Sequence, residues 1–187
     1  MKYYMDFYLL PGTEFAVPIL MNALFDKLHR AFVEINSREL GISFPHVLRE
    51  KPFLGDCLRV HGSILSLEHL MAQNWLTGLH DYLQIETIKL VPRHSLHCRV
   101  QRVQPKTNVD RLRRRYVKRH GVTEKEAACL IPDTVEKRVN LPFLQIKSQS
   151  TGQHFCLFIE HLMPQEQAVN GEFNSYGFSH TATVPWF

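Results

Sequence analysis

Three groups of side chains in this sequence are of types that can do chemistry. His94, His97 and Cys98 lie within five residues of one another and could supply three metal ligands. No second ligand pair follows at the spacing of a zinc finger, so we expect no metal site there. Ser148 and Ser150 are two residues apart, which would place both hydroxyls on one face of a strand. Neither lies in the turn that presents a serine nucleophile in hydrolases, so we do not expect covalent serine catalysis.

Histidine is the third group, because imidazole can exchange a proton at neutral pH. With an unperturbed pKa of about 6.5, a histidine about 3 Å from a hydroxyl can act as a general base. Among the eleven histidines, His29 lies on the edge of a predicted helix, next to Leu28 and one turn from Phe25 and Val33. On the pattern alone, packing is the more common role for a histidine placed like His29, and an ordinary polar strand face is the more common role for the two serines.

The basic residues are concentrated in one segment. The chain of 187 residues has a formal net charge of +4, but residues 93–120 contain ten Arg or Lys and only one acid, Asp110. That segment therefore carries +9, and the rest of the chain carries −5. Because the positive charge is local, we expect a polyanionic partner.

A helix over residues 108–120 would place much of this charge on one side. At 100° per residue, five basic side chains fall within an arc of about 140°: Arg111, Arg114, Arg115, Lys118 and Arg119. Their repulsion costs about one to two kcal/mol unless a partner neutralises it. A solvated helix face is the alternative, but the shortage of acids favours phosphate binding. A short RNA hairpin, whose major groove opens at its ends and loop, could admit such a helix.

Apolar spacing and turn residues predict the elements that position these groups. Leucines and Phe32 at every fourth position predict a helix over residues 17–35. A second helix is predicted over residues 67–83 with Ser66 as its N-cap and a possible break at Gly78. The remaining strands up to Pro92 are predicted at residues 2–10, 41–45, 57–62 and 85–91. This order predicts a ferredoxin-like domain, related to the RNA-recognition motif, over residues 1–92.

The second predicted domain spans residues 93–187 and gives an α+β fold class overall. A strand over 97–104 precedes the basic helix, which Asn108 would cap and Gly121 would end. Thr123 and Glu126 form a capping box for another helix. The other predicted β segments are residues 143–150 and 154–161, joined through Thr151-Gly152, and tail segments 173–179 and 183–187.

Composition narrows the class of protein. A hydrophobic content of 44% with twelve Phe indicates a packed core. The four cysteines show no CxxC pair and the first residues are not those of a secretory leader, so we expect reduced thiols in a cytoplasmic protein. The longest apolar runs are far shorter than the roughly 20 residues of a membrane helix, so we expect no membrane association.

Several segments together resemble one known family. The chain is similar to the CRISPR-associated endoribonucleases that process repeat RNA in type I-F systems, and the likeness covers nearly its full length with little need for gaps. The combination of SQSTGQHF, the arginine helix and the final VPWF is specific. The segments that carry the likeness are DKLHRA, VQRVQPKTNVDRLRRRYVKRHG, IPDTVEKRVNLPF, SQSTGQHFCLFIEH, FNSYGFS and VPWF.

The resemblance implies an activity and a set of partners. Such an enzyme binds the CRISPR repeat stem-loop RNA and cleaves the precursor at the 3′ base of the hairpin without a metal ion or other cofactor. The 2′-hydroxyl attacks the adjacent phosphate, which leaves a 2′,3′-cyclic or 3′ phosphate and a 5′-hydroxyl. The enzyme then retains the mature CRISPR RNA and joins the other subunits of the type I-F interference complex.

The resemblance also assigns roles to individual residues. His29 matches the catalytic histidine, Ser148 matches the serine that holds the attacking hydroxyl, and Tyr176 matches a tyrosine that orients the histidine. Ser150 is a second candidate hydroxyl. The residues that match RNA-binding positions are Arg102 and Gln104 at the foot of the stem, Phe155 stacked on the terminal base pair, and Arg114, Arg115 and Arg119 in the groove.

The sequence departs from the family pattern at two places, and two alternative functions are also consistent with it. Lys118 stands where arginine is expected, which converts a bidentate contact into a point charge. Residues 163–172 are unlike the family, so they carry no assignment. One rival is a non-catalytic RNA-hairpin-binding subunit of a ribonucleoprotein, and the other is a DNA-binding regulator.

Overall fold

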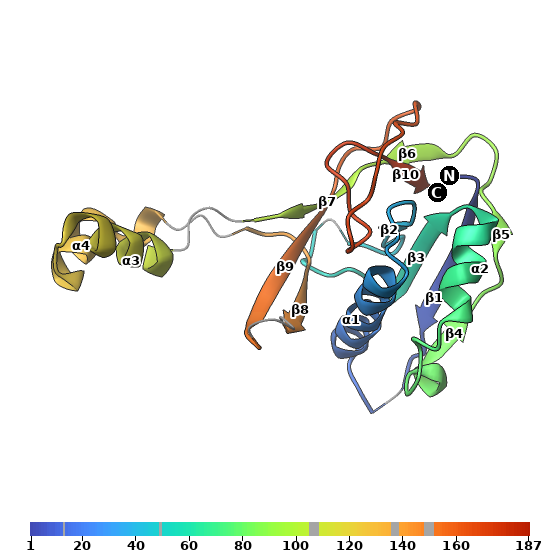
Figure 1. The fold of residues 1–187 in the computed structure, drawn as a ribbon, viewed down its shortest axis with the longest axis horizontal. Helices are drawn as coiled ribbons and strands as arrows, with labels where there is room; N and C mark the ends of the chain where they lie inside the picture. Colours follow the sequence, from blue (N-terminus) through green and yellow to red (C-terminus); the bar gives the residue numbers. More distant parts are fainter. Residues whose placement is uncertain (13, 49, 105–108, 136–138, 148–151) are drawn as a thin grey trace. The chain divides into compact units, whose positions relative to one another are not determined.

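The computed structural model describes every residue except 13, 49, 105–108, 136–138 and 148–151 (Figure 1). It has the predicted α+β character, with helices and several antiparallel sheets. Contacts group the described residues into two compact units, which we call the main unit (residues 1–103 and 141–187) and the inserted unit (residues 104–140). The predicted boundary near Pro92, between domains 1–92 and 93–187, stays a prediction.

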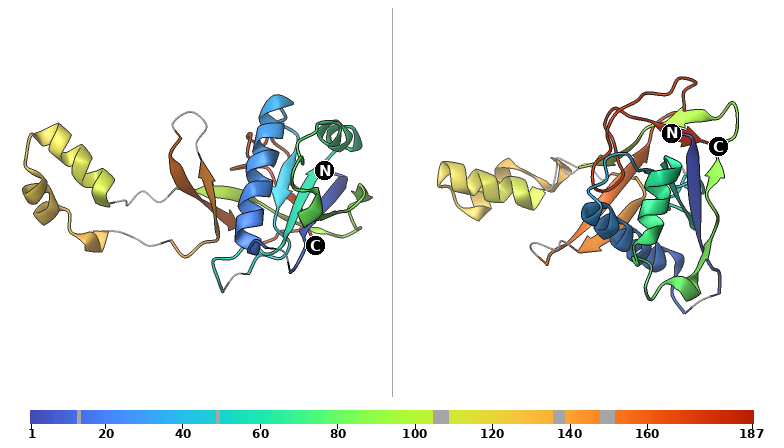
Figure 2. Two further views of the ribbon diagram at one scale, coloured as in Figure 1. Left: turned by 90° about the horizontal axis from the view of Figure 1, so that it is seen from below. Right: turned by 45° about the vertical axis from the view of Figure 1, so that its right-hand side comes forward.

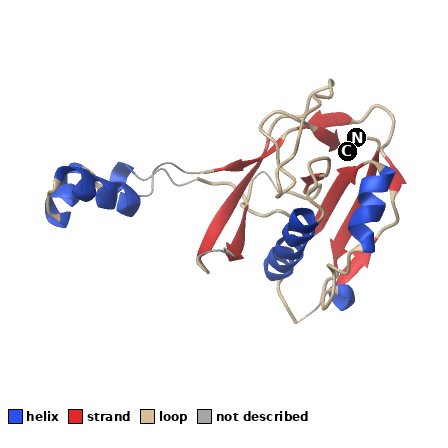
Figure 3. Ribbon diagram, viewed as in Figure 1, coloured by secondary structure: helices blue, strands red, loops and turns tan. Residues whose placement is uncertain are grey.

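The first part of the main unit follows the predicted order of strand, helix, strand, strand, helix, strand (Figure 3). Its sheet has the antiparallel order β2-β3-β1-β4, and the short strand β5 continues β4 along the edge of β1. The elements are β1 (Tyr3–Leu9), α1 (Val17–Glu34), β2 (Gly41–Ser43), β3 (Cys57–Gly62), α2 (Ile64–Ala72), β4 (Leu83–Ile85) and β5 (Lys89–Leu90), with a 3₁₀ turn η1 (His80–Tyr82) before β4.

The apolar stripe of α1 forms the centre of the core. Leu20, Leu24, Leu28 and Phe32 are spaced by four residues and are no more than 3% exposed. They pack in one cluster with alternate residues of β1 and β3, including Phe7. Burying a side chain of this size stabilises the fold by about 1.5–3 kcal/mol, so α1 is held firmly against the sheet. Pro18 is tolerated because it lies in the first turn.

The structure corrects the predicted second helix. The N-cap is Ser63 rather than Ser66, because the Ser63 side chain accepts the backbone N–H of Ser66 at 3.1 Å. The helix ends at Ala72, where Gln73 turns to extended backbone, well before Gly78. The predicted strand over 85–91 is also divided: the register with β1 shifts by one residue between β4 and β5, which is the signature of a bulge.

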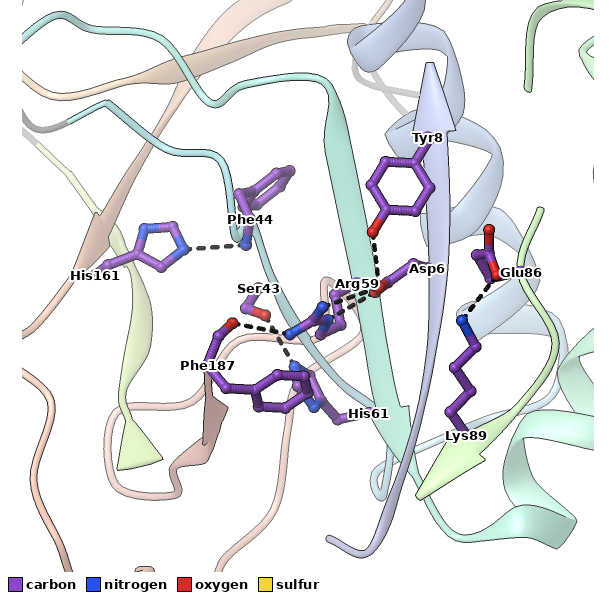
Figure 4. Close-up of polar contacts among 10 residues, drawn as sticks. All are labelled: Asp6, Tyr8, Ser43, Phe44, Arg59, His61, Glu86, Lys89, His161 and Phe187. Atoms are coloured by element: carbon purple, nitrogen blue, oxygen red, sulfur yellow. Dashed lines mark hydrogen bonds and ion pairs between the residues drawn. The ribbon is translucent and has the colours of Figure 1, made fainter. Parts of the chain in front are cut away.

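The other face of the β1–β3 sheet carries buried polar side chains (Figure 4). Asp6 and Arg59 form a bidentate ion pair at 2.6 and 2.9 Å, with side chains 5% and 8% exposed. The Arg59 guanidinium lies over the rings of Tyr4 and Phe187 and donates to the Phe187 carbonyl oxygen at 3.1 Å. The end of the chain therefore covers this face of the sheet.

Two further groups on this face, the partly buried Tyr8 and the fully buried His61, have shifted pKa values. Burial, followed by the Asp6 charge, raises the pKa of Tyr8 to about 12, and the Tyr8 hydroxyl donates to Asp6 at 3.2 Å. His61 is fully buried with its Nε2 2.8 Å from the Ser43 hydroxyl, and burial holds its pKa well below 6.5. His61 is therefore neutral at physiological pH.

The remaining strands of the main unit form two small sheets. The predicted hairpin is confirmed as β8 (Phe143–Lys147) and β9 (His154–His161), which pair antiparallel, while β7 (Val100–Val103) lies on the other side of β9. Strand β6 (Leu96–Cys98) pairs instead with β10 (Val184–Trp186). The single strand predicted over 97–104 is therefore wrong: the chain changes partner at Arg99, so two short strands replace it. Val103 and Phe143 both pair with Phe158, from opposite sides of β9.

The inserted unit is helical (Figure 2). Its elements are α3 (Val109–His120), α4 (Glu124–Leu130) and the 3₁₀ turn η2 (Asp133–Val135). Gly121 follows α3 with φ +64° and donates to the Val117 carbonyl at 2.9 Å, so it ends the helix as predicted. The Thr123–Glu126 capping box is also confirmed. The predicted cap Asn108 lies outside the described residues.

Candidate active site and nucleic-acid interface

His29 lies on the last turns of α1, half-buried, where its ring reaches the tail of the chain. Its Nδ1 is 2.8 Å from the backbone carbonyl oxygen of Ser175, which is 146 residues away. A carbonyl oxygen only accepts, so Nδ1 carries the proton and Nε2 keeps its lone pair in the neutral ring. Among the described residues Nε2 has no hydrogen-bond partner, which leaves it available as a base.

Tyr176 covers one face of the His29 ring. The two rings are 4.0 Å apart between centroids and 11° from parallel, and Tyr176 lies in turn parallel to Phe25 at 6.2 Å. Phe25 is fully buried in the core and also contacts Phe178. The Ser175 carbonyl therefore holds the imidazole by a hydrogen bond in the plane of the ring. Tyr176 packs on one face of the imidazole and is itself stacked on the buried ring of Phe25.

The tail segment 173–179 is a tight turn and not the β segment expected. The Gly177 N–H donates to the Asn174 carbonyl at 2.8 Å, which closes a turn with Ser175 and Tyr176 at its centre. Asparagine at the first position and glycine at the fourth are typical of such a turn, so the sequence FNSYG did contain the signal. Ser175, Asn174 and Phe25 are site residues that sequence reasoning missed, because their contacts are made by a carbonyl group, a turn and a buried ring.

The structure brings together only some of the predicted catalytic residues. His29 and Tyr176 are in direct contact. Ser148 and Ser150 lie outside the described residues, so their roles stay predictions. The described part of β8 ends at Lys147, and β9 begins at His154.

Arg102 and Phe155 form a second pair of predicted residues in contact. The Arg102 guanidinium lies over the Phe155 ring at 5.5 Å from its centroid, one on β7 and the other on β9. The Arg102 Nε atom is buried and has no hydrogen-bond partner in the described structure. The terminal guanidinium nitrogens of an arginine beside an aromatic ring can hydrogen-bond a base while the ring stacks on one. Gln104 is exposed at the start of the inserted unit.

All five predicted groove residues on α3 are exposed to solvent: Arg111, Arg114, Arg115, Lys118 and Arg119. Arg114 donates to the Asp110 carbonyl oxygen at 3.4 Å within the helix. No acid among the described residues forms an ion pair with Arg115, Lys118 or Arg119. Their mutual repulsion is therefore not relieved within the described chain, which is the condition expected of a phosphate-binding surface.

Arg113 has a different role from its neighbours. Its Nε donates to the Ile131 carbonyl at 2.9 Å, and its guanidinium forms an ion pair with Asp133 at 2.9 Å. It therefore ties α3 to the segment after α4. On the helical wheel Arg113 lies away from the five exposed basic residues, and in the structure this face of α3 contacts Ile131 and Asp133.

No cluster of three or more His, Cys, Asp or Glu side chains among the described residues is placed to hold a metal ion. His94, His97 and Cys98 do not form one, and Cys98 is fully buried in β6. Likewise, within the part of the chain that is described, no helix has both the length and the apolar character needed to span a membrane.

Comparison with known proteins identifies the family. Residues 4–187 match the family described as CRISPR-associated protein Cas_Csy4. The chain belongs to the Csy4 family. Two relatives, each named CRISPR-associated endonuclease Cas6/Csy4, align over 187 residues that cover all of both chains. The protein of Pseudomonas aeruginosa strain UCBPP-PA14 is 46% identical, and that of Escherichia coli strain UTI89 is 43% identical.

The family match covers both candidate sites of the chain. The Csy4 family match includes α1 with His29, the whole inserted unit and the tail turn with Tyr176, so both candidate sites lie in family sequence. Membership in the Csy4 family confirms the resemblance seen in the sequence segments.

Proposed function

We propose that this protein is a metal-independent endoribonuclease that binds the CRISPR repeat stem-loop and cleaves precursor CRISPR RNA at the 3′ base of the hairpin. Family membership and the names of the two relatives support a CRISPR-associated endonuclease. The observation that carries the chemistry is the environment of His29. Its Nδ1–H is committed to the Ser175 carbonyl and its ring is stacked on Tyr176, which presents Nε2 as a base at neutral pH.

The proposed reaction is an in-line displacement at phosphorus. His29 Nε2 takes the proton of the ribose 2′-hydroxyl as that oxygen forms a bond to the adjacent phosphorus. The bond from phosphorus to the 5′-oxygen breaks, which leaves a 2′,3′-cyclic phosphate and a 5′-oxygen that takes up a proton. Ser148, with Ser150 as the second candidate, would hold the 2′-hydroxyl in line. Correct alignment of attacking and leaving atoms is itself a large part of the rate gain in such reactions.

RNA binding would divide between two surfaces. Arg102 with Phe155, and Gln104 beyond them, would contact bases at the foot of the stem. The exposed basic face of α3 would contact phosphates along the groove, with Arg111, Arg114, Arg115 and Arg119 as the main contacts. Lys118 would give a point-charge contact to a phosphate rather than a bidentate contact to a base.

The wider context follows from the family. The order of elements in residues 1–92 supports a ferredoxin-like domain that carries the catalytic histidine, and residues 93–187 would supply the RNA-binding parts. We propose that the protein acts in the cytoplasm without a cofactor, retains the mature CRISPR RNA and joins the other subunits of the type I-F interference complex.

Cleavage of a repeat hairpin in the presence of EDTA tests the proposal. Wild-type protein should cut the RNA with EDTA present, and it should bind but not cut a hairpin with a single 2′-deoxy nucleotide upstream of the scissile phosphate. His29→Ala should lower the cleavage rate by about 10²–10⁴-fold with little change in hairpin affinity. His69→Ala is the matched control, because His69 lies on α2 and makes no contact with the site.

Three results would contradict parts of this proposal. Cutting of the 2′-deoxy hairpin would exclude attack by the 2′-hydroxyl. Binding without any cleavage would favour the non-catalytic RNA-binding subunit. Duplex DNA that competes as well as the hairpin would favour a DNA-binding regulator.

A further inference from the structure

We infer that Asn174 is a positioning residue for the cleavage reaction: its side-chain oxygen holds the turn that presents the Ser175 carbonyl and the Tyr176 ring to His29. This inference rests on the proposed catalytic role of His29. It concerns a residue whose side chain is exposed, makes no direct contact with the imidazole and was not among the candidates from the sequence.

Asn174 makes four hydrogen bonds within the turn. Its side-chain Oδ1 accepts the backbone N–H of Tyr176 at 2.9 Å and that of Phe178 at 3.2 Å. Its own N–H donates to the Phe178 carbonyl at 2.9 Å, and its carbonyl accepts the Gly177 N–H at 2.8 Å. The side-chain bonds mimic a backbone turn, which short polar side chains such as asparagine do well.

The far end of the turn is fixed independently, at Gly177. Its carbonyl accepts the Ile42 N–H at 3.1 Å, which joins the turn to β2. It has φ +75°, and a Cβ added there would lie 2.8 Å from Ile42 Cγ2 and 3.0 Å from Phe32 Cε2. Gly177 therefore packs closely against the core and is hydrogen-bonded to β2, which holds that end of the turn. Before the turn, Phe173 is buried and its N–H donates to the Arg38 carbonyl at 3.0 Å, whereas Asn174 itself is exposed and holds the turn through its side-chain oxygen.

Both contacts to His29 come from the two residues between these ends. Ser175 supplies the carbonyl that keeps the proton on Nδ1, and Tyr176 supplies the ring that lies on the imidazole. The Asn174 oxygen binds the Tyr176 N–H, which belongs to the same peptide group as the Ser175 carbonyl. Rotation of that peptide would remove the carbonyl from Nδ1. Loss of the Asn174 oxygen therefore releases the group that selects the tautomer of His29.

Two variants test the contribution of the Asn174 side-chain oxygen. Asn174→Thr keeps a side-chain oxygen that can accept the N–H two residues on, whereas Asn174→Val has nearly the same shape and no acceptor. The Val variant should have a single-turnover cleavage rate lower by about 10–100-fold, because a misplacement of the catalytic group by about 1 Å costs that order of rate. The Thr variant should regain most of the rate, and both should bind the hairpin with dissociation constants within about threefold of wild type.

The tautomer of His29 gives a readout that does not depend on activity. Nitrogen-15 NMR of the full chain, above the titration range of histidine, should show His29 protonated at Nδ1 in wild type and in Asn174→Thr. In Asn174→Val the Nε2–H form, which predominates for free histidine in water, should become populated. Ser63→Ala is the control for general destabilisation, because it removes a side-chain cap from α2 without touching the turn; it should leave both rate and tautomer unchanged.

Several results would overturn the inference. They are a Val variant that cleaves at the wild-type rate, one that is slow but keeps His29 in the Nδ1–H form, and a Thr variant that is as slow as Val. If Asn174→Val does not fold, Asn174→Ala lacks the same oxygen and takes its place. Failure of the proposed function would look different: His29→Ala would then cleave normally, whatever the tautomer in the Asn174 variants.

Discussion

The stack of Tyr176 on His29 predicts that the ring of Tyr176, and not its hydroxyl, supports cleavage. The two rings are 4.0 Å apart and 11° from parallel, and the far side of Tyr176 faces the buried ring of Phe25. Tyr176→Phe keeps this arrangement and should cleave within about twofold of the wild-type rate. Tyr176→Leu removes the ring but keeps an apolar side chain between His29 and Phe25.

The expected size of the effect follows from the stacking energy. An aromatic pair contributes about 0.5–1.5 kcal/mol beyond the area that it buries. If that energy holds the imidazole in its reactive orientation, its loss lowers the rate by between about twofold and tenfold, since about 1.4 kcal/mol corresponds to a factor of ten. The Ser175 carbonyl is unaffected, so Tyr176→Leu should stay faster than His29→Ala.

Single-turnover cleavage of the repeat hairpin at saturating protein measures this directly, with thermal unfolding as the check on folding. Rates that fall in the order wild type, Tyr176→Phe, Tyr176→Leu, with the first two nearly equal, support the reasoning. A Tyr176→Phe variant as slow as Tyr176→Leu would refute it, because the hydroxyl would then take part in the chemistry.

Four further predictions concern RNA binding, pH dependence and stability. Arg115→Ala should weaken hairpin binding and reduce the slope of log affinity against log salt by about one. Arg113→Ala should lower the thermal stability of the inserted unit, measured by circular dichroism, because it removes the contacts of α3 with Ile131 and Asp133. His61 has a pKa well below 6.5 because it is buried, so the unfolded chain binds a proton that the folded chain does not as the pH falls below about 6.5. The free energy of unfolding should then fall by up to about 1.4 kcal/mol per pH unit, and urea titrations at pH 7.5 and 5.5 should show a smaller fall in His61→Gln. Arg59→Met should lower the free energy of unfolding by about 3–5 kcal/mol, because it leaves Asp6 buried without its partner. Adding Asp6→Leu to the same chain should recover much of this loss. Urea unfolding that shows no loss in the Arg59→Met variant would contradict the buried ion pair.

Elements whose signals are local were predictable from the sequence. The four-residue spacing from Leu20 to Phe32 predicted α1 to within a residue at each end, and the Thr123–Glu126 capping box predicted the start of α4. Strand β3 was predicted with its observed bounds. In each case the deciding interactions lie within one turn or one strand, so residue type and spacing were sufficient.

Features that depend on distant partners were not predictable in the same way. The division of β6 from β7 at Arg99 arises because the two strands pair with different segments, at residues 184–186 and 154–161. Arg113 differs from Arg115 because only Arg113 contacts Ile131 and Asp133, in the segment that follows α4. The acceptor for His29 Nδ1 is a backbone carbonyl, which every residue possesses, so no residue type could have pointed to Ser175.

The inserted unit joins the main unit at two points that lie close together on one small sheet. The chain leaves the main unit after Val103 and returns shortly before Phe143, and both residues pair with Phe158. These points are thus two strand spacings apart, about 10 Å, and a short linker could bridge them. If residues 104–140 carry the proposed phosphate contacts of α3, a relative's segment placed between the same two strands would alter the affinity for RNA without a change to α1, the tail turn or the residues around His29.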